Sequence, residues 1–140
     1  IFNFTNNYLS YNNLSELEDD EGALLIQGTI STGSGTITIS GNTLENNGSG
    51  NTNHLFHVNL NAPSVTTNIS NNSMTENESM PDPVFGVIYQ GTNSALVVSN
   101  NQVTNNGQGI HGIRMGIYVY MKHGTASVTN NLIMGNTAKG

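Results

Sequence analysis

The sequence predicts an all-β solenoid in which short parallel strands wind into stacked coils of about 30 residues. Three observations predict this fold class. A nine-residue unit returns five times along the chain, the residues before each unit alternate between apolar and polar side chains, and the composition disfavours helices. A repeat of this length is typical of architectures in which each coil buries its apolar face against its neighbours.

The composition excludes several classes of protein. The 140 residues include 24 Asn and 28 Ser plus Thr, but only 9% are charged, so the residues that build long helices are scarce. With three Lys plus Arg and a net charge of −6, the chain lacks the basic surface of a nucleic-acid binder. The sequence holds no apolar run long enough for a transmembrane helix and no cysteine for a disulfide or a thiolate metal site.

The repeated unit reads apolar, Ser/Thr, Asn/Gly, Asn, any residue, apolar, any two residues, Asn. Its first conserved asparagine, here called the anchor, falls at Asn7, Asn42, Asn72, Asn101 and Asn131, with spacings of 35, 30, 29 and 30 residues. A second asparagine follows each anchor by five positions, at Asn12, Asn47, Asn77, Asn106 and Asn136. The apolar positions lie three before and two after each anchor, for example Ile39 and Leu44.

Each unit predicts three strands. The stretch before an anchor alternates with period two, as in Thr36 to Ile39, and the Asn and Gly residues within the unit break a helix. A third apolar segment follows most units, at Ala23–Ile26, His54–Val58, Val84–Tyr89 and Ile113–Met121. Three short strands separated by Asn-rich corners describe one coil, so the chain should form about four and a half coils.

Stacking of coils explains why the anchors are identical. Like positions in adjacent coils then lie one strand spacing apart, roughly 4.8 Å. A buried amide needs hydrogen-bond partners, and the amides above and below it supply them. We therefore predict a structural ladder formed by Asn7, Asn42, Asn72, Asn101 and Asn131.

These units resemble those of the right-handed parallel β-helix family with pectate-lyase-like repeats. The resemblance is carried by residues 39–47, 98–106 and their three counterparts, and it covers nearly the whole chain. It implies a right-handed parallel β-helix, of the type found in adhesin and autotransporter passengers. Residues 1–140 are expected to form a single segment of a longer solenoid, because no capping element is visible, and its coils could associate end to end.

The resemblance implies that an enzyme of this family would use clustered carboxylates. This sequence contains only nine carboxylates. An acidic run at 16–21 holds five of the nine carboxylates and is expected to be a solvated loop. Glu45 and Glu76 lie beside corners of successive units and are a weak candidate for the carboxylate pair of a glycosidase. The sequence therefore predicts no catalytic residue, no metal site and no cofactor.

One segment favours ligand binding. From Ile113 to Met121 every second residue is apolar, while Arg114, Tyr118, Tyr120 and Lys122 fall on the opposite face. Aromatic rings flanked by cations suit sugar rings, anionic glycans or a partner protein, although tyrosines that merely cover an exposed strand would give the same pattern.

The functional hypothesis is that this chain is a structural or binding passenger segment of a secreted or cell-surface protein. We expect it to be exposed at the outer membrane. Its loops would bind a glycan or a host or cell-surface protein. The alternative is a carbohydrate-active enzyme, a polysaccharide lyase or hydrolase, whose catalytic groups lie mostly outside this stretch. Nucleic acid is not an expected partner.

Overall fold

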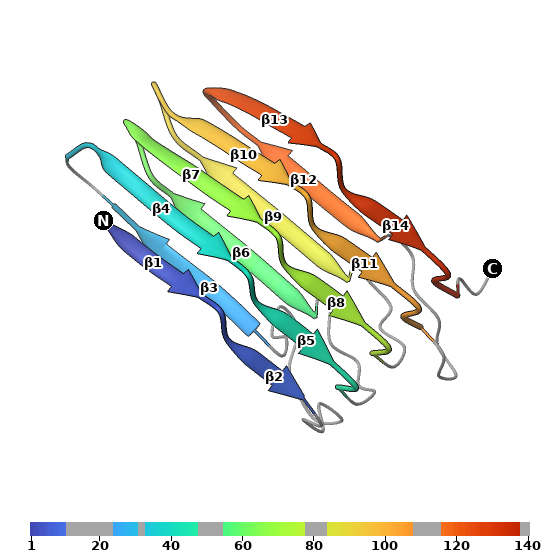
Figure 1. The fold of residues 1–140 in the computed structure, drawn as a ribbon. Coiled ribbons are helices and arrows are strands. Elements are labelled where there is room, and N and C mark those ends of the chain that lie inside the picture. The colour runs from blue at the N-terminus through green and yellow to red at the C-terminus, as the bar shows by residue number, and fades with distance from the viewer. Residues whose placement is uncertain (11–23, 31–32, 48–54, 78–83, 108–115, 138–140) are drawn as a thin grey trace.

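The residues that the structure describes form 14 strands in three parallel sheets. The computed structural model describes residues 1–10, 24–30, 33–47, 55–77, 84–107 and 116–137. Successive strands pass from one sheet to the next, so that every third strand returns to the same sheet one coil further on (Figure 1). Within the described part of the chain, no helix has the length and apolar character needed to cross a membrane.

Sheets A and B are built from the repeated unit and its preceding residues. Sheet A contains β1 (Phe2–Thr5), β4 (Gly35–Ser40), β7 (Val65–Ser70), β10 (Ala95–Ser99) and β13 (Thr125–Thr129). Sheet B contains β2 (Tyr8–Ser10), β5 (Thr43–Glu45), β8 (Ser73–Thr75), β11 (Gln102–Thr104) and β14 (Leu132–Met134). The two strands of each unit are separated by only two residues, which include the anchor.

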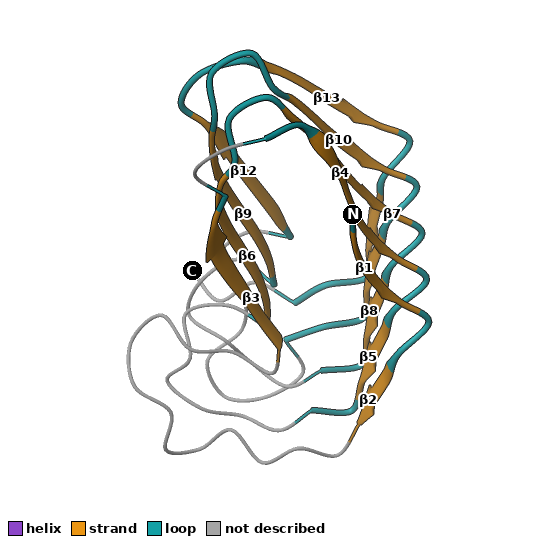
Figure 2. Cartoon of the chain, turned by 90° about the vertical axis from the view of Figure 1, so that its left-hand side faces the viewer, coloured by secondary structure: helices purple, strands orange, loops and turns teal. Residues whose placement is uncertain are grey.

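Sheet C is formed by the third apolar segment of each coil. It contains β3 (Leu24–Thr29), β6 (Phe56–Asn61), β9 (Phe85–Gln90) and β12 (Ile117–Met121). Seen along the stack, sheet C faces sheets A and B across the interior (Figure 2). The predicted stack of three-stranded coils is therefore confirmed.

The register of the sheets places equivalent residues of successive coils side by side. The apolar position two after each anchor forms one continuous column, in the order Leu9, Leu44, Met74, Val103 and Ile133. The inner three members of this column are fully buried. Because each coil repeats the same inward positions, one apolar core runs along the whole stack.

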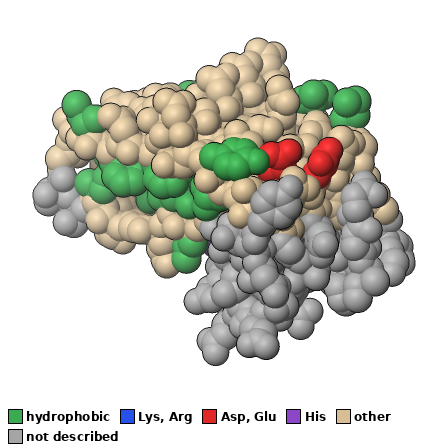
Figure 3. All heavy atoms as spheres, turned by 60° about the horizontal axis from the view of Figure 1, so that its bottom comes forward, with side chains coloured by type: hydrophobic (Ala, Val, Ile, Leu, Met, Phe, Trp, Pro, Cys, Tyr) green, Lys and Arg blue, Asp and Glu red, His purple; other side chains and the backbone are tan. Residues whose placement is uncertain are grey.

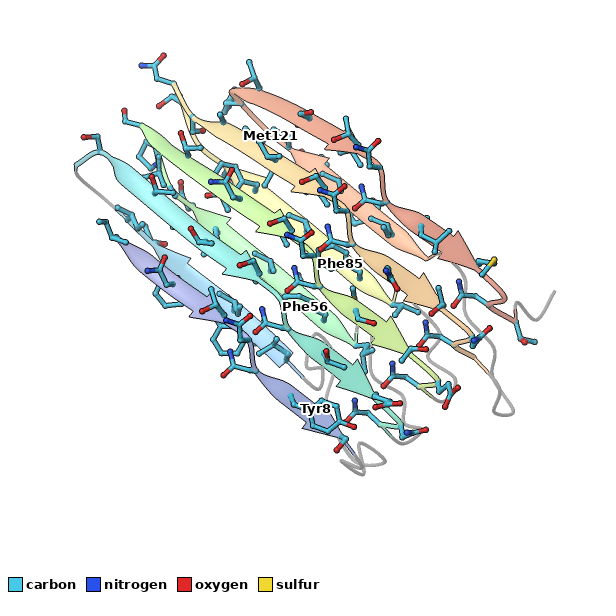
Figure 4. The ribbon with its side chains drawn as sticks, in the orientation of Figure 1. Tyr8, Phe56, Phe85 and Met121 are labelled. Atoms are coloured by element: carbon cyan, nitrogen blue, oxygen red, sulfur yellow. The ribbon has the colours of Figure 1, made fainter. Side chains whose placement is uncertain are left out.

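The core on the sheet C side is aromatic. Phe56 and Phe85 occupy the same register position in β6 and β9, and their rings stack with centroids 5.0 Å apart (Figure 4). Tyr89 is fully buried, and its hydroxyl donates to the carbonyl oxygen of Ala62 at 3.1 Å and accepts from Thr67 Oγ1 at 3.2 Å. The buried hydroxyl of Thr67 is thereby satisfied within the core.

The anchors form the predicted ladder. Nδ2 of each anchor donates to Oδ1 of the next one, at 2.9, 2.8, 2.9 and 2.9 Å along the series from Asn7 to Asn131. The backbone N–H of each anchor donates to the same Oδ1, for example from Asn42 to Asn72 at 3.1 Å. The second hydrogen of Nδ2 in Asn72 donates to the carbonyl of Ile39 in the preceding coil. Each interior amide is therefore fully paired although it is wholly buried.

A second ladder repeats this arrangement at the other end of sheet B. Nδ2 of Asn47, Asn77 and Asn106 donates to Oδ1 of the next member of the series at 2.9, 2.8 and 2.9 Å, and the described series ends at Asn136. Asn12 lies outside the described residues. The second conserved asparagine of the unit is thus a ladder residue in its own right.

The residue before each ladder asparagine adopts a left-handed backbone conformation. Every one of these positions has a φ between 51° and 66°, and the residues are Asn6, Gly41, Asn46, Asn71, Glu76, Asn100, Asn105, Asn130 and Gly135. Asn and Gly tolerate this conformation best, which explains why they dominate the corners. At Gly41 a Cβ atom would also clash with the side-chain amide of Asn6 in the coil before.

The outward positions of sheet A are uncharged. They are occupied by Ser, Thr and Asn, with one Ala and one Val, in all five strands. The Ser/Thr position two before each anchor belongs to this outer surface, at Thr5, Ser40, Ser70, Ser99 and Thr129. Sheet A therefore presents a polar face without charge.

Candidate functional site

The candidate binding strand is β12, the outermost described strand of sheet C. Ile117, Val119 and Met121 pack against the core, as their alternation predicts. Tyr118 and Tyr120 consequently occupy the outward positions between them. The predicted members Ile113, Arg114 and Met115 lie outside the described residues, so the strand as described begins directly after Gly116.

The two tyrosines differ in exposure. Tyr120 is 46% exposed, whereas Tyr118 is half-buried. Their register partners in β9 are Gly86 beside Tyr118 and Ile88 beside Tyr120. The half-buried side chain of Ile88 thus extends the apolar surface beside Tyr120 along the outside of sheet C. Of the two rings, Tyr120 is the one more open to a ligand.

Lys122 follows directly after β12 and is exposed. Its backbone N–H donates to the carbonyl oxygen of Tyr89 at 3.0 Å, which continues the pairing of β12 with β9 past the end of the strand. Lys122 is the only Lys or Arg in the described ranges, and no carboxylate among those residues forms an ion pair with it.

A polar hollow begins immediately after Lys122, at the corner where the chain passes from sheet C to sheet A. It has a volume of about 640 Å³ and is lined across three successive coils by turn and strand residues that include Thr66, Thr92, Asn93, His123 and Thr125. The lining offers hydroxyl and amide groups and no carboxylate or Lys/Arg side chain. Sequence reasoning missed this hollow, because its lining residues lie up to 61 positions apart in the sequence.

The hollow continues toward the first coil. A second depression of about 280 Å³ lies at the same corner and is lined by Ile30, Ser34 and Thr36. Val65 contributes to both depressions, so they adjoin along the stack. The two depressions together form a trough at the corner between sheets C and A, and its second part is also lined by the apolar side chains of Ile1, Phe2 and Ile37.

The described carboxylates lie on the opposite side of the molecule from sheet C. Glu45 and Glu76 are the only ones in the described ranges, and the acidic side chains lie near each other on one face, beside a hydrophobic side chain (Figure 3). Glu45 Oε2 accepts a hydrogen bond of 2.6 Å from the hydroxyl of Tyr8 in the first coil. Glu45 ends β5 and pairs in register with Thr75, while Glu76 occupies the left-handed corner that follows.

A metal site is not formed by the residues that the structure describes. No group of three or more His, Cys, Asp or Glu side chains among them is placed to hold a metal ion. The acidic run at 16–21 lies outside the described ranges. His57 is buried in β6, and His123 lies in the loop after β12, so these two histidines belong to different parts of the coil.

Three parallel sheets, coils of about 30 residues and two buried asparagine ladders define this chain as a parallel β-helix. No protein-family model, no curated protein and no solved structure matches the sequence.

Proposed function

We propose that this chain is a non-catalytic binding segment of a secreted or surface-exposed protein of the adhesin or autotransporter-passenger type. The ligand is a glycan, held by the outer face of β12 and the adjoining trough. The observation that carries the proposal is the pair of outward tyrosines on β12, followed along the chain by the exposed Lys122 and by His123, which lines a hollow with hydroxyl and amide groups.

The chemistry of this surface fits a sugar better than an apolar ligand. The faces of pyranose rings carry C–H groups that pack on an aromatic ring such as Tyr120, while the edges carry hydroxyl groups that need hydrogen-bond partners. The trough supplies such partners at Thr66, Asn93 and Thr125. Lys122 supplies a charge for a carboxylate or sulfate group, so an acidic glycan is the preferred class.

The scaffold supports a role outside the cell. A stiff stack of coils projects a binding surface away from its attachment point, and the uncharged polar face of sheet A interacts weakly with charged surroundings. In this role the two asparagine ladders hold the coils in register, so that side chains of successive coils keep fixed positions along the trough.

The proposal is tested by titrating the purified chain with acidic and neutral oligosaccharides in a calorimeter. Tyr120→Ala should weaken binding of both classes about fivefold, because one aromatic contact contributes on the order of 1 kcal/mol. Lys122→Gln should weaken only the acidic class. The matched control is Tyr8→Ala, since Tyr8 is a 63% exposed tyrosine on sheet B, far from the trough.

Two results would overturn the proposal. The first is equal loss of affinity in Tyr8→Ala and Tyr120→Ala, or no binding by the wild-type chain. The second is turnover of an acidic polysaccharide, measured with and without calcium, that is lost in Arg114→Ala. That second result would show that the chain is a carbohydrate-active enzyme and not a non-catalytic binding segment.

A further inference from the structure

The second asparagine ladder contains a dipeptide that is chemically labile in a free chain. Asn106 is followed directly by Gly107, and the same dipeptide occurs at Asn47 and Gly48. In such a sequence the glycine nitrogen readily attacks Cγ of the asparagine side chain, because glycine has no Cβ atom to hinder the approach. The new N–Cγ bond forms as the glycine nitrogen loses its proton, and the side-chain amide leaves as ammonia. Water then opens the resulting succinimide to aspartate or isoaspartate.

The folded chain holds the groups that would react. The N–H of Gly107 donates to the carbonyl oxygen of Asn77 at 2.9 Å. Nδ2 of Asn106, the leaving group, donates to the carbonyl oxygen of Met74 and to Oδ1 of Asn136, both at 2.9 Å. Asn106 and Gly107 are both buried, so the water needed to remove the proton and to open the ring does not reach them.

One set of contacts acts in the opposite direction, and it does not suffice. Oδ1 of Asn106 accepts from the backbone N–H of Asn77 at 3.1 Å and from its Nδ2 at 2.8 Å, and such donors stabilise the negative charge that develops on an attacked carbonyl. The attack still requires the nitrogen of Gly107 to leave the carbonyl of Asn77 and to turn toward Cγ. The two coils must therefore separate first, and the rate follows the population of that open state.

We propose that Asn106 is a site of spontaneous deamidation that the folded ladder suppresses and that unfolding exposes. The products do not fit the ladder. Aspartate would place a charge and two acceptor oxygens against the carbonyl of Met74 and Oδ1 of Asn136, where Nδ2 now donates. Isoaspartate lengthens the main chain by a methylene group and shifts the residues after it out of register.

The consequence is that unfolding becomes progressively irreversible. Each period in the unfolded state converts part of the chains, and a converted chain cannot rebuild the second ladder. The ladder thus protects the chemical identity of the asparagines from which it is built. This inference is independent of the proposed glycan binding.

The experiment follows conversion of the 140-residue chain in mildly alkaline buffer, folded and in guanidinium chloride, by digestion and mass spectrometry. In denaturant, Asn106 should convert as fast as it does in a synthetic peptide of residues 103–110. In the folded chain it should convert more than about tenfold more slowly. Asn77 is the matched internal control: it is buried in the same ladder, but Glu78 follows it, so it should convert far more slowly than Asn106 in denaturant.

Two variants separate the chemistry from the protection. Gly107→Ala, measured in denaturant where folding plays no part, should slow conversion of Asn106 because the new Cβ hinders the attack. Asn77→Ala, measured folded, removes the Nδ2 contact with Asn106 and should speed conversion, whereas Gln102→Ala at an exposed position should not. If Asn77→Ala does not fold, low concentrations of denaturant applied to the wild-type chain should raise the rate as the open state becomes more populated.

Refolding provides the final measurement. After ageing in denaturant and dilution, chains converted at Asn106 should be missing from the folded fraction. Conversion of Asn106 at equal rates in the folded and unfolded chain would overturn the proposal. So would an Asn106 that stays intact in denaturant while the peptide converts, or converted chains that refold with the stability of fresh ones.

Discussion

Asn101→Ala tests the ladder that holds the coils together. Asn101 is wholly buried, and its side chain takes part in four hydrogen bonds. Nδ2 donates to the carbonyl of Ile69 at 3.0 Å and to Asn131 at 2.9 Å, while Oδ1 accepts from the backbone N–H and the Nδ2 of Asn72 at 3.0 and 2.9 Å. Truncation to alanine removes all four of these bonds at once.

The cost follows from the groups left behind. Two donors of Asn72 lose their acceptor in a place that water does not reach, and an orphaned buried donor costs about 1–3 kcal/mol. We therefore expect Asn101→Ala to lower the free energy of unfolding by about 4 kcal/mol. This exceeds the usual effect of a single substitution, because one side chain serves as donor and as acceptor for two neighbouring coils.

Urea denaturation followed by circular dichroism measures this loss. The control is Gln102→Ala, because Gln102 is the exposed neighbour of Asn101 and should cost less than about 0.5 kcal/mol. If Asn101→Ala does not fold, Asn131→Ala gives a second measurement: it should cost less, since this last rung is half-buried and water can replace its partners. Equal losses for Asn101→Ala and Gln102→Ala would refute the reasoning.

Three further substitutions test other parts of the fold in the same assay. Glu76→Asn should raise the free energy of unfolding by about 0.5–1 kcal/mol, because Glu76 holds a φ of 54° that Asn tolerates better. Gly41→Ala should lower it by about 1–3 kcal/mol, since the new Cβ meets Asn6 and the φ is 66°. Leu44→Asn should lower it by more than about 4 kcal/mol, because an amide without partners enters a fully buried apolar column.

Matched variants test whether the changes in stability come from backbone strain, from a steric clash and from burial of an amide. Glu76→Gln removes the charge but keeps the strained backbone, so a gain equal to that of Glu76→Asn would contradict the conformational explanation. Gly35→Ala places a Cβ in open space, and a loss as large as that of Gly41→Ala would contradict the clash. A Leu44→Asn variant as stable as Gln102→Ala would mean that the column is not a closed core.

The sequence predicted the architecture because each buried side chain contacts the equivalent residues of the adjacent coils, and these contacts restrict which residue type fits. Asn72 contacts Asn42 and Asn101, which lie 30 and 29 residues away, so the requirement for a partner leaves an identical residue at a constant spacing. The left-handed corners were harder to recognise, because Glu76 occupies one of them without the side chain that usually marks such a turn. The buried hydroxyl pair of Thr67 and Tyr89 was also missed: alternation with Phe85 and Val87 places Tyr89 on the inner face, but only the three-dimensional fold brings Thr67, 22 residues away, within hydrogen-bond distance.

The candidate binding surface could be predicted only in part. The alternation of β12 predicts that Tyr118 and Tyr120 share a face, and the packing of Val119 and Met121 against the core agrees with it. The trough beside Lys122 could not be predicted, because its shape depends on turns of different length in neighbouring coils. Residues 62–64 join β6 to β7, whereas 91–94 join β9 to β10. A glycan ligand for this surface remains a prediction.

The common direction of the ladder amides gives the rod an electrical polarity. Nine described side-chain amides point the same way, from Asn7 to Asn131 and from Asn47 to Asn136. An amide has a dipole moment of about 3.5 D, so aligned groups sum to at most roughly 30 D along the axis. This contribution has its positive end at the last described coil and its negative end at the first. Such a rod would turn in an electric field even with its charged side chains neutralised, and transient electric birefringence would detect the orientation.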